Sequence, residues 1–119
     1  MTTAAAVVDL DLPDEQDSFE MANLYPRDTG LPMTVWVSAK AGARHDIRVK
    51  VCMTPGQRME VDNLAVVSVR PEPRLLHGDL SSADLAAVRG WINLNSGLLI
   101  DFWDGRASTV DLVRGLQKV

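Results

Sequence analysis

The sequence is poor in the residues that build metal centres and disulfide frameworks. Cys52 is the single cysteine among 119 residues, and His45 and His77 are the two histidines. One cysteine excludes an internal disulfide and a cysteine-based zinc site, and neither histidine has metal-ligand spacing to another histidine or to the cysteine. We therefore predict no metal site and no cofactor, and we expect Cys52 to be a small hydrophobe that is buried or half-buried.

Recognised catalytic motifs are also absent. The sequence contains no glycine-rich phosphate loop, no nucleophile elbow and no Ser/His/Asp grouping. His45 and Asp46 are adjacent in a predicted strand, so their side chains point to opposite faces and make a poor acid–base pair. Asp101 and Asp104 fall near a predicted helix end, where a salt bridge to Arg106 is expected and a paired-carboxylate site is the alternative. We predict no catalytic residue, and an enzyme would need unfamiliar ones.

Long apolar runs are missing as well. No stretch of about 18 apolar residues is present, so no membrane partner is expected. The first residues, "MTTAAAVVDLDLPDEQD", lack the basic region and the long apolar region of a signal peptide, which favours a cytoplasmic protein. With 46% hydrophobic residues, 119 residues suit one domain, which we assign to residues 21–119.

Basic residues do not occur in the first 20 positions, which form an acidic tail. The tail carries six acidic residues, which are Asp9, Asp11, Asp14, Glu15, Asp17 and Glu20. The rest of the chain has ten acidic and twelve basic residues, a formal charge of +2. One-signed charge favours a flexible tail. Interleaved apolar residues such as Leu10 and Phe19 are instead typical of a segment that orders on its own domain or on another chain. Met21 is an alternative start, which would make the tail an optional extension.

Alternating β-branched segments predict three strands, at about residues 33–39, 45–53 and 64–70. Residues 22–32 and 54–63 are predicted to be loops from their Pro, Asp and Gly content, and residues 74–80 to be a loop or a short edge strand.

Two helices are predicted after the strands, at about residues 82–104 and 108–117. Ser81 or Ser82 begins the first and Ser108, with Asp111 three positions later, begins the second. Gly90 and Gly97 suggest close approach of the first helix to the sheet or to the second helix, and residues 95–97, "NSG", are an alternative break in it.

This element order predicts an α+β fold, because strands followed by helices favour an antiparallel sheet. We expect a three-stranded antiparallel sheet with one face covered by the two C-terminal helices and the other face open to solvent.

Strand alternation places charged residues on that open face. Val49 and Val51 share one face of their strand, so Arg48 and Lys50 share the other. A hairpin symmetric about Gly42 would put Trp36 opposite Arg48, with Thr34 opposite Lys50 and Ser38 opposite Asp46. A register slip of one residue would bury both cations. The candidate binding surface therefore consists of Trp36, Lys40, Arg44, Arg48, Lys50 and Arg70.

Three interpretations of this surface stay open. It is an ordinary solvated face on which Trp36 packs with Arg48. Alternatively, it binds single-stranded nucleic acid, with phosphates on the cations and bases on the ring. The third interpretation is a protein partner, including the chain's own acidic tail, which opposite charge would attract. Homodimerisation through an exposed strand edge is a further alternative.

Three motifs carry a family resemblance: "ANLYPRDTGLPMTVWVS", "ARHDIRVKVC" and "WINLNSGLLIDFWDGR". Over residues 22–119 the chain resembles a family of short bacterial proteins of unknown function that are often encoded on plasmids and other mobile elements. A looser likeness is to small toxin–antitoxin-linked proteins, but these carry "PHFH" where this chain has "RHD". The resemblance implies a non-enzymatic accessory protein of a mobile element that binds a macromolecule, with a regulatory or defence protein as the expected partner. A nucleic-acid-binding module is the second hypothesis and a small toxin-like nuclease is the third.

Overall fold

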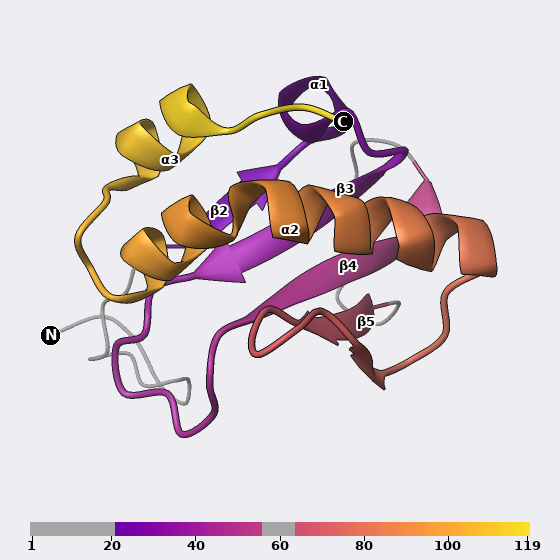
Figure 1. Ribbon diagram of the computed structural model, residues 1–119, viewed down its shortest axis with the longest axis horizontal. Coiled ribbons are helices and arrows are strands. Elements are labelled where there is room, and N and C mark those ends of the chain that lie inside the picture. Colours follow the sequence, from indigo (N-terminus) through magenta and orange to yellow (C-terminus); the bar gives the residue numbers. More distant parts are fainter. Residues whose placement is uncertain (1–20, 56–63) are drawn as a thin grey trace, which may run out of the picture.

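The computed structural model describes residues 21–55 and 64–119, so the acidic tail lies outside the described residues. The described part is an α+β fold with a five-stranded antiparallel sheet in the order β2-β3-β4-β5-β6 (Figure 1). The strands are β2 (Met21–Leu24), β3 (Met33–Ser38), β4 (Arg48–Pro55), β5 (Leu64–Ser68) and β6 (Leu75–His77). The predicted three-stranded sheet is therefore wrong, because a further strand is added at each edge.

Both added strands are too short to show a period in the sequence. β2 has four residues, of which only Ala22 and Leu24 are buried, and it forms by pairing along β3 from Met21↔Ser38 to Leu24↔Val35. β6 has three residues and pairs with β5. Strands of this length are stabilised by their neighbours rather than by their own pattern.

The short helix α1 (Pro26–Thr29) lies within the segment that was predicted to be a loop. The Tyr25 N–H donates to the Asp28 carboxylate at 3.0 Å, which stabilises the start of the helix. Gly30 ends the helix in the left-handed region, with φ 82°. A four-residue helix is one turn, so it leaves no apolar periodicity to detect.

The two C-terminal helices are α2 (Ser82–Trp103) and α3 (Thr109–Gly115). Ser81 Oγ accepts from the Asp84 N–H at 3.0 Å, and Ser108 and Asp111 exchange hydrogen bonds in a capping box. The hydrogen bonds from Ser108 lower the pKa of Asp111. α2 is continuous through residues 95–97, so the alternative of a break there is wrong.

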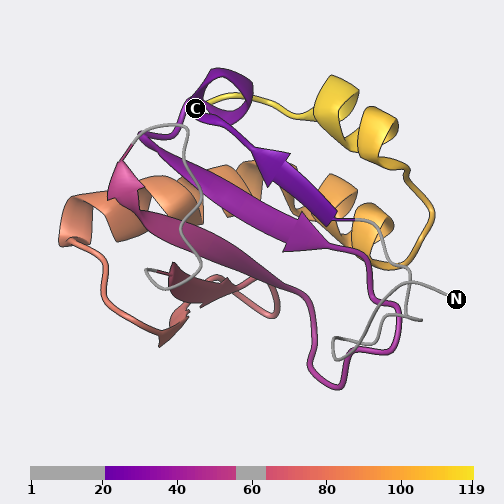
Figure 2. The same cartoon turned by 180° about the vertical axis from the view of Figure 1, so that it is seen from behind.

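The hydrophobic core lies between one face of the sheet and the two helices (Figures 1 and 2). Its largest fully buried side chains are Trp91 and Phe102 from α2. Strands β3, β4 and β5 contribute the alternating residues Val35, Val49 and Val67, each with no exposed surface. Because these alternate residues face α2, Trp36, Arg48 and Lys50 lie on the opposite face of the sheet.

Gly90 and Gly97 do not mark a close approach, contrary to the expectation. A Cβ at either position would have no described neighbour within 4 Å, whereas a Cβ at Gly115 would lie 2.9 Å from Leu98 Cδ2. The glycine that permits close packing of α3 on α2 is therefore Gly115.

The C-terminal segment is held to the fold by Asn95, a buried polar residue of α2. Its Oδ1 accepts from the Gln117 N–H at 2.8 Å, and its Nδ2 donates to the Gln117 and Trp91 carbonyl oxygens, both at 3.0 Å. The Val119 N–H then donates to the Thr29 carbonyl oxygen at 2.9 Å. These contacts fix the C-terminus beside α1.

None of the helices in residues 21–55 and 64–119 has the length and apolar character that crossing a membrane requires.

Candidate functional site

The register of β3 and β4 brings Trp36 beside Lys50. The observed pairs are Val35↔Val51 and Trp36↔Lys50, so the predicted pairing of Trp36 with Arg48 is wrong by two residues. A shift of two residues keeps every side chain on its predicted face. On the other side of β4, Arg48 pairs with Ser68 and Lys50 with Val66.

The connection between β3 and β4 is longer than a tight turn. β3 ends at Ser38 and β4 begins at Arg48, so residues 39–47 form a long loop rather than a tight turn. The Lys40 N–H donates to the Trp103 carbonyl oxygen at 2.8 Å, and the His45 ring lies 5.7 Å from the Trp103 ring. The loop is therefore held against the C-terminal end of α2, and the pairing of Trp36 with Lys50 is not symmetric about Gly42.

A pocket of about 480 Å³ opens between this loop and the open face of the sheet. Its described lining contains cationic, aromatic and small side chains and no aspartate or glutamate; it consists of Met21, Trp36, Val37, Ser38, Lys40, Ala41, Gly42, Ala43, His45, Arg48 and Lys50. Three of these come from β3, two from β4 and one from β2, and the remainder come from the loop. We call this cavity the Trp36 pocket.

Lys40, Arg48 and Lys50 give the Trp36 pocket its charge, and Arg48 and Lys50 are the two that are partly buried. Lys50 Nζ lies 5.1 Å from the centre of the Trp36 ring, in cation–π contact. Burial lowers the pKa of Lys50, and the neighbouring charge of Arg48 lowers it further. Arg48 Nε is buried and has no hydrogen-bond partner in the described part of the chain. Arg48 and Lys50 are therefore two partly buried cations of the pocket. In the part of the chain that the structure describes, no carboxylate forms an ion pair with either of them.

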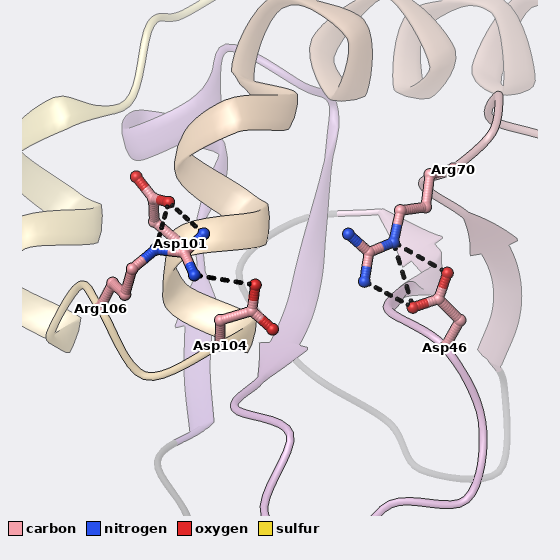
Figure 3. A network of polar contacts seen from close by, with 5 residues as sticks. All are labelled: Asp46, Arg70, Asp101, Asp104 and Arg106. Carbon is pink, nitrogen blue, oxygen red and sulfur yellow. Dashed lines mark hydrogen bonds and ion pairs between the residues drawn. The ribbon is translucent and has the colours of Figure 1, made fainter.

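Two predicted surface residues do not line the Trp36 pocket. Arg70 is turned toward Asp46 and donates to both of its carboxylate oxygens, with the shortest contacts at 2.9 Å (Figure 3). This bidentate pair lowers the pKa of Asp46 and raises the pKa of Arg70. Arg44 is exposed and is not among the lining residues. The sequence pattern could not show the partner of Arg70, because Asp46 is 24 residues away in the chain.

The predicted salt bridge of Asp101 and Asp104 to Arg106 is confirmed. Arg106 Nη2 lies 2.9 Å from Asp101 Oδ1, and Arg106 Nη1 lies 3.2 Å from Asp104 Oδ2 (Figure 3). The hydrogen bond with Asp101 raises the pKa of Arg106. These carboxylates are engaged at the end of α2, which favours the structural interpretation over a paired-carboxylate site.

Thr34 and Cys52 are both buried, with no exposed surface. The burial predicted for Cys52 is confirmed. The prediction that Thr34 stands opposite Lys50 on a solvated face is wrong, because Thr34 is buried and Lys50 pairs with Trp36.

The structure adds several residues that strand alternation did not select. Met21 and Ser38 face each other across β2 and β3 at the border of the Trp36 pocket, and Ala41 and Ala43 belong to the anchored loop. His45 contacts Trp103, and its Nδ1 lies 2.8 Å from the Asp46 carbonyl oxygen, the geometry of an Nδ1–H donor. A four-residue strand and a loop carry no periodic signal, so only the fold brings these residues together.

Comparison with protein-family models, with curated proteins and with solved structures found no match to this chain. The resemblance to proteins of mobile elements therefore stays a prediction.

Proposed function

We propose that this chain is a non-enzymatic binding protein whose Trp36 pocket receives an acidic, partly apolar segment of another protein. The observation that carries the proposal is the pair Arg48 and Lys50, side by side in a pocket whose described lining has no carboxylate. The setting implied by the resemblance, an accessory protein of a bacterial mobile element that acts on a regulatory or defence protein, is part of the same proposal.

The electrostatics of the Trp36 pocket favour an anionic ligand. Burial lowers the pKa of Lys50, and the like charge of Arg48 on the same strand lowers it further. A carboxylate placed between Arg48 and Lys50 would offset both effects. Hydrogen bonds that involve a charged group contribute roughly 1.5–3 kcal/mol each.

The apolar part of the lining favours a peptide over a free anion. Met21 is 40% exposed, and the small apolar residues Ala41 and Ala43 also line the pocket. An aliphatic side chain adjacent to an acidic one would bury apolar surface against these residues, at about 25 cal/mol per Å². A segment in which acidic and apolar residues alternate therefore matches both parts of the pocket.

Nucleic acid is the second candidate, because Trp36, Lys40, Arg48 and Lys50 all line the pocket. Lys50 lies over the Trp36 ring, so a base would have to displace Lys50 to stack on that face. The geometry therefore favours a carboxylate-bearing segment over a stacked base. The contacts of His45 with Trp103 and Asp46 favour a role in holding the loop and add no support to the nuclease hypothesis.

The test is fluorescence anisotropy with three labelled ligands of equal length: an alternating Asp/Leu peptide, its Asn/Leu counterpart and a single-stranded RNA. We expect the Asp/Leu peptide to bind at least tenfold more tightly than the Asn/Leu peptide. Arg48→Gln should weaken binding of the Asp/Leu peptide about tenfold or more, since one charged hydrogen-bond donor is lost. Lys118→Met is the matched control, because Lys118 is exposed and does not line the pocket.

Equal binding of the two peptides would refute the proposal. Tighter binding of the RNA, lost in Trp36→Ala and steeply dependent on salt, would replace it with the nucleic-acid hypothesis.

A further inference from the structure

The Trp36 pocket borders the point where the acidic tail joins the domain. Met21 is the first described residue, and it both pairs with Ser38 and lines the pocket. An extended chain spans at most about 3.6 Å per residue, so Asp17 cannot lie farther than about 14 Å from Met21. The tail therefore begins at the edge of a pocket whose described lining carries positive charge and no carboxylate.

The composition of residues 9–20 matches the ligand that the pocket chemistry favours. The segment contains the six acidic residues of the tail and no basic residue, interleaved with Leu10, Leu12 and Phe19. The domain to which it is attached carries a formal charge of +2. The negative charge of residues 9–20, their apolar residues and their attachment next to Met21 thus all favour binding in the Trp36 pocket.

We propose that residues 9–20 bind in the Trp36 pocket of their own chain and compete with the acidic segment of a partner. This inference rests on the proposed function, because it assigns the chain's own tail to the same site. A tethered segment on a short linker has an effective concentration in the millimolar range. A tail with an intrinsic dissociation constant of about 0.1 mM would therefore weaken binding of an outside segment about tenfold.

Acrylamide quenching of tryptophan fluorescence measures occupancy of the pocket. Of the three tryptophans, Trp91 and Trp103 are buried at 0% and 3% exposure, and Trp36 is the partly exposed one. Added acrylamide should therefore report mainly on Trp36. Trp36→Phe gives the baseline from the two buried tryptophans.

The experiment compares the full-length chain with a full-length variant in which all six acids of the tail become amides. The substitutions are Asp9→Asn, Asp11→Asn, Asp14→Asn, Glu15→Gln, Asp17→Asn and Glu20→Gln. We expect the variant to be quenched at least twofold more strongly. Raising NaCl from 0.05 to 0.5 M should increase quenching of the unmodified chain and leave the variant unchanged, because screening weakens a charge-dependent contact. The salt response tests the inference in the unmodified chain, independently of the substitutions.

Binding of the Asp/Leu peptide by the same two proteins separates this inference from the proposed function. Stronger quenching together with about tenfold tighter peptide binding by the variant supports both. Unchanged quenching overturns tail docking, and peptide binding by the unmodified chain then leaves the proposed function standing. Stronger quenching with no peptide binding by either protein supports tail docking and overturns the role as a receptor for an outside partner.

Discussion

Replacing Lys50 with methionine should stabilise this protein and weaken its binding at the same time. Lys50 stands two positions from Arg48 on β4, on the face turned away from α2, and burial together with the charge of Arg48 lowers its pKa. Methionine keeps a long, unbranched side chain against the Trp36 ring but removes the charge. The two effects have opposite signs, because a charge placed to bind a ligand carries an electrostatic penalty when no ligand is present.

The magnitude follows from the strand geometry. Residues two apart in a strand are separated by about 6.8 Å. Two unit charges at that distance repel by about 0.6 kcal/mol in water and by about 2.4 kcal/mol at an effective dielectric constant of 20. Losing the cation–π contact with Trp36 offsets roughly 0.5–1 kcal/mol of this gain. Lys50→Met should therefore raise the free energy of unfolding by about 1 kcal/mol, which is about 4 °C in Tm for a domain of this size.

Urea denaturation at a series of pH values tests the reasoning. The pKa of Lys50 is lowered in the folded state from a reference value of 10.5. Below the folded-state pKa the penalty is present in full. Between the two pKa values the unfolded chain binds more protons than the folded chain, so stability rises with pH. The advantage of Lys50→Met should thus be greatest near neutral pH and should shrink as pH rises toward 10.5.

Lys118→Met is the matched control, because Lys118 is exposed on the C-terminal segment, and it should leave the free energy of unfolding unchanged. A loss of stability in Lys50→Met, or a stabilisation that stays constant with pH, would refute the reasoning. A loss of stability would show that Lys50 has a structural role, and a constant stabilisation would show that the charge of Lys50 is not its cause. A gain of stability together with at least tenfold weaker binding of the Asp/Leu peptide is the signature of a binding residue.

Two further substitutions test how the fold around the Trp36 pocket is held. Asn95→Ala should lower the free energy of unfolding by about 2 kcal/mol in urea titrations, since it removes both hydrogen bonds to the backbone of Gln117. Gly30→Ala should lower it by about 2 kcal/mol, because Gly30 has φ 82° and its Cβ would overlap the carbonyl oxygen of Val119. Gly97→Ala is the control for both and should stabilise the protein by roughly 0.5–1 kcal/mol, as Gly97 lies within α2 with open space beside it. A destabilising Gly97→Ala would contradict the open packing there, and a neutral Asn95→Ala or Gly30→Ala would contradict the role given to the C-terminal segment.

Capping residues made the starts of the two C-terminal helices predictable from the sequence. The side-chain oxygens of Ser81 and Ser108 accept hydrogen bonds from free backbone amides. The two C-terminal helices, α2 and α3, therefore begin within a residue of their predicted starts. β2 and α1 were not predicted as elements, and β6 was predicted only as the alternative of a short edge strand within residues 74–80, because segments of three or four residues complete no period. The inference drawn from Gly90 and Gly97 was wrong for a related reason, since a glycine in the sequence does not say which element lies beside it.

The sequence by itself determined that Arg48 and Lys50 share a face with Trp36, because side chains alternate along a strand and buried charge is unfavourable. Only the tertiary structure decided which partner each side chain meets. The register of β3 and β4 places Lys50 over Trp36, and the 39–47 loop that joins these strands contacts Trp103. The fold also turns Arg70 to Asp46 and brings Met21 to the Trp36 pocket. These outcomes depend on contacts between residues far apart in the chain, which a local pattern does not encode.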